Sequence, residues 1–422
     1  MVGFIILIAY FILLILSFNK INSPTLKLNL IAISTPWFFY FSIIYLFQVK
    51  FYNFNINFFI IILILSILSY FSCISGYNNT IKKNNINKIH KFKYFNEYYN
   101  FAIILGIIGA SATIFGRLEN LGDFLNYSNP EEIYKLRYSA NLSDAGLRIE
   151  NNIEYLKIFY PFSFISIVAV GGSLINKFLR YICLILFIVG ALMVAGRFNI
   201  LYTVISLIIT VYFNNKNILN WKNFFIVLIF AYFLAFTFNL RSPDFDTLNF
   251  YKRVANISDI SFLGIDNLEG KFITPIYNII TYYVQSANHL TNFLSDYDLR
   301  DYTYGGYQFE IVFNIINKIL GTSFVTKREL SIYDPSFGLF STYTRDLMSD
   351  FGYINCIFFS VLTGYFLGVF AVKKDEHWIY RTIYHYLIIQ FILAPMVLIY
   401  VDFILLNHIY LLAILFFKQK KI

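Results

Sequence analysis

The feature that most constrains this chain is a succession of apolar runs, each long enough to form a membrane-spanning helix. A helix needs about 20 apolar residues to cross the hydrocarbon core of a bilayer. Only helices and closed barrels satisfy every backbone polar group there, and continuous runs of this length indicate helices. The sequence therefore predicts an all-α, polytopic transmembrane helical bundle of about eleven spans. We expect these near residues 2–18, 28–48, 56–75, 98–116, 158–176, 179–195, 198–213, 223–239, 351–372, 382–400 and 403–417.

Composition agrees with a single polytopic membrane domain over residues 1–422. The chain is 58% hydrophobic and 14% charged, with a mean hydropathy of +0.62, so a water-soluble fold would leave a very large apolar surface exposed. Membrane lipids are therefore expected partners. The net charge of +9 does not point to nucleic acid, because the lysines stand in short runs between apolar segments. The first run lacks a basic start and a cleavage site, so we expect it to be a retained helix rather than a signal peptide.

The short basic loops predict how the chain is oriented. With eleven spans all of them fall on one side, which the positive-inside rule assigns to the cytoplasm. The N-terminus is then outside and the C-terminus inside. The outer side receives two long loops, residues 117–157 and 240–350. The basic loops contain Lys20 and Lys27; Lys82, Lys83, Lys88, Lys91 and Lys93; Lys177 and Arg180; Lys216 and Lys222; Lys373, Lys374 and Arg381; and Lys418, Lys420 and Lys421.

Residues 272–294 form an apolar stretch within the larger outer loop, interrupted by several polar residues. A twelfth span there would break the parity of the charged loops. We therefore expect a helix that lies on the outer interface or dips into it, followed by a second amphipathic helix near residues 308–320.

Arg197 follows Gly196 at a predicted outer turn between two long apolar runs. An arginine at the bilayer centre costs roughly 2.5 to 3.5 kcal/mol in insertion measurements, so this position needs an explanation. One explanation is a side chain that ends a helix and extends to the interface. The other is an anion contact, because a guanidinium forms paired hydrogen bonds with phosphate oxygens. Arg117, Arg241 and Arg253 also lie at outer ends or in outer loops and are candidates for the same basic pocket.

Charges, hydroxyls and glycines concentrate at the end of the larger outer loop, just before the span near 351–372. Asp350 fits either a helix cap or a catalytic carboxylate. Asp346 and Arg345 are harder to explain as caps. His289 lies on an otherwise apolar segment and is either a buried, hydrogen-bonded side chain or a base.

The sequence gives little support for metal-dependent or nucleotide-dependent chemistry. Two Asp-x-Asp pairs, at residues 244–246 and 296–298, have the spacing of metal-dependent sugar transferases, but such pairs arise easily in polar loops of this length. The sequence has no Walker-type P-loop, His-Glu-x-x-His or Gly-x-Ser-x-Gly. We therefore expect neither a metal site nor a cofactor.

Two short motifs resemble the Wzy-type O-antigen and capsule polymerases, the oligosaccharide repeat-unit polymerases of bacterial surface polysaccharides. The first is Ser341-Thr342-Tyr343-Thr344, followed by Ser349-Asp350-Phe351-Gly352-Tyr353 and Gly364. It is similar to that family's Asn-x-Tyr-Thr and Asp-Phe-Gly-x-x-Gly stretch, although Ser341 replaces the usual Asn and Asn355 stands where Gly is common. The second is Gly196-Arg197 at the outer turn, with Arg253 and Gly264 eleven positions apart as a weaker likeness.

The resemblance implies a GT-C-like glycosyltransferase of the bacterial cytoplasmic (inner) membrane. It would move a growing glycan from undecaprenyl pyrophosphate to a new lipid-linked repeat unit at the outer face. Arginines would stabilise the departing pyrophosphate without a metal. Asp346, Asp350 or His289 would accept the proton of the acceptor hydroxyl. The implied substrate-binding residues are Arg117, Arg197, Arg241, Arg253, Arg345 and Tyr343. A chain-length regulator is an expected partner.

Three other functions stay open at this point. An O-antigen ligase uses a related architecture and the same donor, and Arg197-x-x-x-Leu201 fits an arginine motif of that family. A flippase for lipid-linked oligosaccharide predicts broken helices and charged residues at mid-membrane, whereas the charges here cluster near the ends of spans and in outer loops. A structural membrane subunit is the third alternative.

Overall fold

A computed structural model gives the fold of six parts of the chain. It describes residues 2–115 except 20, 22, 53–54, 57–58 and 85–96; residues 156–193 except 157–158, 161 and 169–173; residues 257–261 and 274–295; residues 313–325 except 314–315 and 318; and residues 343–395 except 377. The predicted spans near 198–213, 223–239 and 403–417 lie outside these residues.

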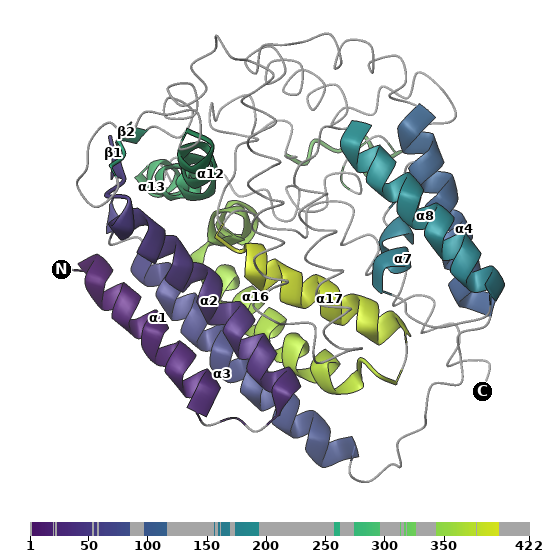
Figure 1. Cartoon of the computed structure of the whole chain (residues 1–422), viewed down its shortest axis with the longest axis horizontal. Helices are drawn as coiled ribbons and strands as arrows, with labels where there is room; N and C mark the ends of the chain where they lie inside the picture. The colour runs from purple at the N-terminus through teal and green to yellow at the C-terminus, as the bar shows by residue number, and fades with distance from the viewer. Residues whose placement is uncertain are drawn as a thin grey trace.

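The described residues are mostly helical, which confirms the predicted all-α class (Figure 1). The helices are α1 (Val2–Asn19), α2 (Pro24–Leu46), α3 (Phe59–Asn84), α4 (Glu97–Phe115), α7 (Ile165–Val168), α8 (Leu174–Met193), α12 (Thr274–Val284), α13 (Ser286–Ser295), α16 (Tyr343–Lys373) and α17 (Trp378–Leu393). Two short strands, β1 (Lys50–Phe51) and β2 (Ile257–Asp259), pair antiparallel.

Three of these helices are long and apolar enough to cross a membrane, over Pro24–Leu46, Phe59–Lys82 and Ile354–Lys373. Val2–Phe18 and Tyr99–Phe115 are apolar but shorter. Helices of this length and composition indicate a membrane protein.

Helices α1, α2, α3 and α16 pack side by side (Figure 1). Buried hydroxyl pairs join α1 to α3, with Tyr10 Oη 3.0 Å from Ser66 Oγ and Ser17 Oγ 3.0 Å from Tyr70 Oη. Both pairs advance in the same direction along the two sequences, so α1 and α3 run parallel. Interhelical hydrogen bonds of this kind hold helices together where lipid removes the hydrophobic driving force.

Glycines bring α3 and α16 into backbone contact. A Cβ atom on Gly364 would collide with the carbonyl oxygen of Ser69, and one on Gly368 with the carbonyl oxygen of Cys73. Gly76 of α3 stands equally close to the backbone of α16 at Tyr365. Small residues spaced four apart allow this approach in membrane helices. Gly364, one of the glycines that carries the family resemblance, therefore has a packing role.

The described basic turns gather at one end of the bundle, called here the lysine end. Lys374, in the turn between α16 and α17, donates to Thr25 Oγ1 at the start of α2 over 3.0 Å. Ser23, which caps α2, contacts Tyr77 Oη near the end of α3. This agrees with the prediction that the basic loops share a side. The opposite end, called the ribbon end, carries β1 and β2.

Lys374 is buried, with 5% of its surface exposed. Its ammonium lies 5.5 Å from the ring centre of Tyr384. Burial penalises the charged form and lowers the pKa of Lys374 to about 8, while the nearby Asp375 carboxylate acts in the opposite direction.

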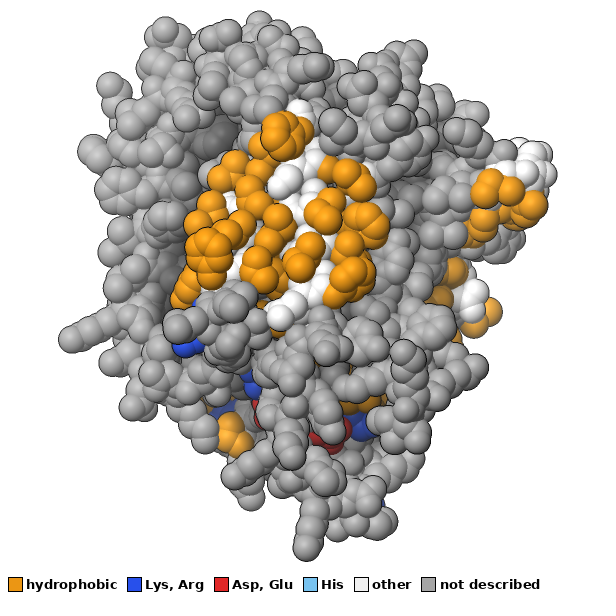
Figure 2. Space-filling model, turned by 90° about the vertical axis from the view of Figure 1, so that its right-hand side faces the viewer, with side chains coloured by type: hydrophobic (Ala, Val, Ile, Leu, Met, Phe, Trp, Pro, Cys, Tyr) orange, Lys and Arg blue, Asp and Glu red, His pale blue; other side chains and the backbone are white. Residues whose placement is uncertain are grey.

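One side of the molecule, where α4 and α8 lie, carries a broad patch of apolar side chains (Figure 2). Its exposed members are Phe101, Ile104, Ile108 and Phe115 of α4 and Phe178, Tyr181, Ile185 and Val189 of α8. Exposed patches of this density mark contact with lipid or with another apolar surface. Contact with the lipid of a bilayer would keep these apolar side chains out of water.

The structure corrects four predicted spans. Helix α3 continues to Asn84 rather than ending near residue 75. Helix α8 begins at Leu174 rather than at 179, so Lys177 and Arg180 lie in a helix and not in a loop. Residues 159–160 and 162–164 form 3₁₀ turns that lead into α7, so residues 158–176 are not one continuous helix. Helix α17 begins at Trp378 and ends at Leu393 rather than covering 382–400. Pro395 explains this end, because the residue before a proline is disfavoured in the α-region.

Candidate functional site

Helix α16 begins with a short segment, Tyr343–Phe351, that differs in direction from the rest of the helix (Figure 1). The change occurs at Gly352, where φ is 75° and ψ is −179°. A side chain is strained in this conformation and glycine is not. The predicted span near 351–372 is therefore preceded by a separate helical segment, joined to it by a turn that Gly352 permits without strain.

This short segment carries three buried ionisable side chains. Arg345, Asp346 and Asp350 are 3%, 1% and 0% exposed. Asp346 and Asp350 are four positions apart, which places both carboxylates on one face of the helix. Charged residues are almost never fully buried unless they are paired, and in membrane proteins they mark functional sites. The segment is therefore the strongest candidate site in the described part of the chain.

Helix α13 forms one wall of this site. The guanidinium carbon of Arg345 lies 5.8 Å from the ring centre of Phe293, which is itself buried. A cation over an aromatic face is attracted by the ring quadrupole, and more strongly where water is excluded. Leu347 and Met348 of the same segment are also buried, so the whole segment lies inside the protein.

The break between α12 and α13 is fixed by hydrogen bonds to two other helical elements. Tyr40 Oη of α2 donates to Val284 O over 3.1 Å and lies 3.0 Å from Ser286 Oγ. Ser286 Oγ donates to Pro395 O, just beyond the end of α17, over 2.5 Å. Tyr40 lies six residues before the end of α2, or about 9 Å below it at 1.5 Å per residue. Helices α12 and α13 therefore reach into the bundle from its ribbon end.

This arrangement refines the prediction for residues 272–294. The expected helix is two helices, and their buried residues pack into the bundle rather than along its surface, including Tyr277, Ile280, Val284, Leu290 and Phe293. Whether this region lies on the membrane interface or dips into it stays a prediction. In the predicted second amphipathic segment, Phe313, Ile316, Asn317, Ile319 and Leu320 are helical, and the chain leaves the helix at Gly321 with φ 66°.

The structure brings together three of the predicted site residues: Arg345, Asp346 and Asp350. Tyr343 begins α16 and His289 belongs to α13, but their side chains lie outside the described part. The four remaining candidates, Arg117, Arg197, Arg241 and Arg253, lie wholly outside the described residues. Ser286, Tyr40 and Phe293 were not predicted. The polar pair Gln285 and Ser286 interrupts an apolar run, so the sequence indicated a helix break here. It did not indicate that Ser286 bonds to Tyr40 and Pro395.

Within the described residues, no group of three or more His, Cys, Asp and Glu side chains is placed to hold a metal ion. Asp346, Asp350 and Arg345 supply two carboxylates and one guanidinium on one short segment. A carboxylate can accept a proton, and a guanidinium can stabilise a departing phosphate.

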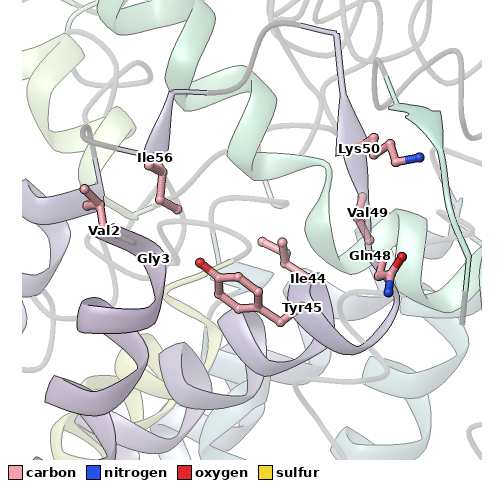
Figure 3. Close-up of a pocket in the computed structure, with 8 residues that line it drawn as sticks. All are labelled: Val2, Gly3, Ile44, Tyr45, Gln48, Val49, Lys50 and Ile56. Carbon is pink, nitrogen blue, oxygen red and sulfur yellow. The ribbon is translucent and has the colours of Figure 1, made fainter. Parts of the chain in front are cut away.

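A separate cavity of about 550 Å³ lies at the ribbon end between α1, α2 and Ile56 (Figure 3). It is lined by Val2, Gly3, Ile44, Tyr45, Gln48, Val49, Lys50 and Ile56. The Tyr45 hydroxyl points toward Gly3, and the Lys50 side chain points away from the apolar centre. None of the predicted site residues lines it, and no polar groups converge there. We therefore do not assign chemistry to this cavity.

Comparisons with protein-family models, with curated proteins and with solved structures found no match.

Proposed function

We propose that this chain is a polymerase of lipid-linked oligosaccharide repeat units, of the Wzy type. It is a metal-independent glycosyltransferase of the bacterial cytoplasmic membrane, with about eleven spans and a GT-C-like architecture. Its N-terminus is outside, so the ribbon end faces the outer side. The observation that carries the proposal is the burial of Arg345, Asp346 and Asp350 on one helical segment that approaches from this end.

The proposed reaction uses these groups in complementary roles. The acceptor hydroxyl of a new repeat unit attacks the anomeric carbon of the growing glycan, forming one C–O bond. The bond from that carbon to undecaprenyl pyrophosphate breaks, and the lipid pyrophosphate leaves with both electrons of the bond. Arg345, together with the outer-loop arginines, stabilises this developing charge. Asp346 or Asp350 accepts the hydroxyl proton.

The proposal is tested by deleting the gene in its host and restoring it as the intact form, Arg345→Ala, Asp346→Asn or Asp350→Asn. Asp259→Asn is the matched control, because Asp259 is 44% exposed in an ion pair at the ribbon end. Membrane abundance of each variant is measured, and surface polysaccharide is separated on a gel. We expect deletion to leave a single repeat unit without a ladder. The intact gene and Asp259→Asn should restore the ladder, whereas Arg345→Ala and at least one buried Asp variant should not.

Other outcomes distinguish the alternatives. A ligase predicts that deletion leaves no repeat unit on the lipid A core while lipid-linked polymer persists. An unchanged ladder on deletion would rule out the polymerase.

A flippase is a second candidate, and a specific feature favours it. Helical elements break at Gly352, at Gln285 and after Leu393, and substrate sites of carriers form where helices are discontinuous. Purified protein in liposomes separates the two functions. A polymerase lengthens repeat units supplied together with it on one face, and a carrier moves them across without lengthening them.

A further inference from the structure

We propose that Ser286 is a positioning residue that holds α13, and with it Phe293, against Arg345. The hydrogen-bonded group of Ser286, Tyr40, Val284 O and Pro395 O is called here the latch. Its consequence for glycan transfer depends on the proposed function, whereas the latch itself does not.

The latch satisfies two backbone carbonyls, one at the end of a helix and one just beyond the end of another. The carbonyl of Val284 is at the end of α12, and that of Pro395 lies beyond the end of α17. A helix end leaves carbonyls without intrahelical donors, and they are costly to bury unpaired. Val284, Ser286 and Pro395 are all buried. The hydroxyls of Ser286 and Tyr40 supply the donors.

The protons can be assigned because each hydroxyl has one. The shortest bond, 2.5 Å, takes the Ser286 proton to Pro395 O. The single proton of Tyr40 is then shared between Val284 O and Ser286 Oγ, both of which accept. Ser286 is therefore the connection between α2, the end of α17 and the first residue of α13.

The first residue of α13 is fixed in this way, and Phe293 lies seven residues further along the same helix. Seven residues are close to two full turns, so Ser286 and Phe293 share a face of α13. The same helix face thus contacts the latch at one end and the Arg345 guanidinium at the other. Losing the latch should release α13 from the bundle and leave the guanidinium without its aromatic wall.

A cysteine-accessibility experiment tests the latch without any measurement of activity. Leu290 of α13 is 0% exposed and is replaced by cysteine as the reporter. The native Cys73, Cys183 and Cys356 are free and buried, so they report a general loss of structure. Membranes made permeable to a small polar maleimide are labelled, and each site is quantified by mass spectrometry.

Leu290→Cys is combined with Ser286→Ala or with Tyr40→Phe, each of which removes one latch hydroxyl and adds no volume. Ser34→Ala is the matched control, since Ser34 is also fully buried but bonds only within α2, to Leu30 O. We expect labelling at position 290 to rise about tenfold in both latch variants, as expected when a buried carbonyl loses its donor. It should not rise with Ser34→Ala, and the native cysteines should stay protected.

Two results would overturn the latch. The first is maleimide labelling at position 290 that stays as low in the latch variants as in the parent. The second is equal labelling of Cys73 and Cys356, which would make Ser286 a contributor to general stability only. The ladder assay is read separately. If gene deletion leaves the polysaccharide unchanged, the proposed function fails, while the labelling result still decides whether α13 is latched.

Discussion

Replacing Lys374 with methionine should remove a buried positive charge and change how stability depends on pH. Methionine has a similar length and no charge. The ammonium of Lys374 is held by Thr25 and by the ring of Tyr384, both of which are uncharged. These contacts do not offset the desolvation of the charge fully, because the pKa of Lys374 falls from its ordinary value of 10.5 to about 8.

The size and sign of the effect follow from that pKa. Between pH 8 and pH 10.5 the unfolded chain holds a proton on Lys374 that the folded protein has lost, so stability rises with pH in this window. Below pH 8 both states are charged, and the penalty is fully present. From pH 7 to pH 10, linkage predicts that this one group raises the free energy of unfolding by about 2 to 3 kcal/mol.

Thermal unfolding of the purified protein in detergent, at pH values from 7 to 10, checks this prediction. Lys374→Met should be more stable than the parent at pH 7, and its advantage should shrink by about 2 to 3 kcal/mol on going to pH 10. The comparison between the two proteins cancels groups that titrate equally in both. Lys82→Met is the control, because Lys82 is an exposed residue at the same end of the bundle. Identical pH profiles for Lys374→Met and the parent would show that Lys374 is not desolvated and would refute the reasoning.

Three further predictions concern the stability of the fold. Gly368→Ala places a Cβ against the backbone of Cys73 and within 2.7 Å of the Tyr77 nitrogen, so it should lower the free energy of unfolding by about 1 to 3 kcal/mol. Ile354→Ala, at an 81% exposed position of the same helix, should change it far less in the same detergent unfolding assay. Tyr10→Phe removes the bond to Ser66 and should cost about 0.6 to 2 kcal/mol by equilibrium unfolding, and equal stability of variant and parent would count against that bond. Lys50→Ala breaks an exposed ion pair with Asp259, and thermal unfolding should detect a change of no more than about 1 kcal/mol.

Much of the helical framework could be predicted from the sequence. Helix α1 matches the predicted 2–18 within one residue, and α4 matches 98–116 within one residue at each end. These helices are continuous apolar runs without internal glycine turns or late prolines, so hydropathy alone locates them. Predictions failed where a local backbone requirement overrode hydropathy. The apolar run near 382–400 continues past Leu393, but Pro395 ends the helix inside it.

The candidate site was predictable only in part. The density of charge before the span near 351–372 identified Asp346 and Asp350, but hydropathy placed them in a solvated loop. Their burial depends on the turn at Gly352, whose backbone angles sequence pattern does not reveal. The partners of Ser286 were also invisible, because Tyr40 is 246 positions away and Pro395 is 109 positions away. Hydrogen bonds over such separations follow from tertiary packing.

The buried charges bear on whether the protein is an enzyme or a carrier. From the sequence alone, a carrier was disfavoured because the charges lie near the ends of predicted spans, whereas carriers place charges at broken helices within the membrane. In the structure, Arg345, Asp346 and Asp350 are buried beside such a break. The burial of these three side chains fits either an enzyme or a carrier. The position of the site along the bundle distinguishes the two. Carrier sites lie near the bilayer midplane, open to each side in turn, whereas this segment enters from the ribbon end and is walled by α13. About 20 residues of α16, a full membrane thickness of helix, lie between Gly352 and the lysine end. With the outer orientation proposed above, a site at the ribbon end suits chemistry on a substrate that has already crossed the membrane.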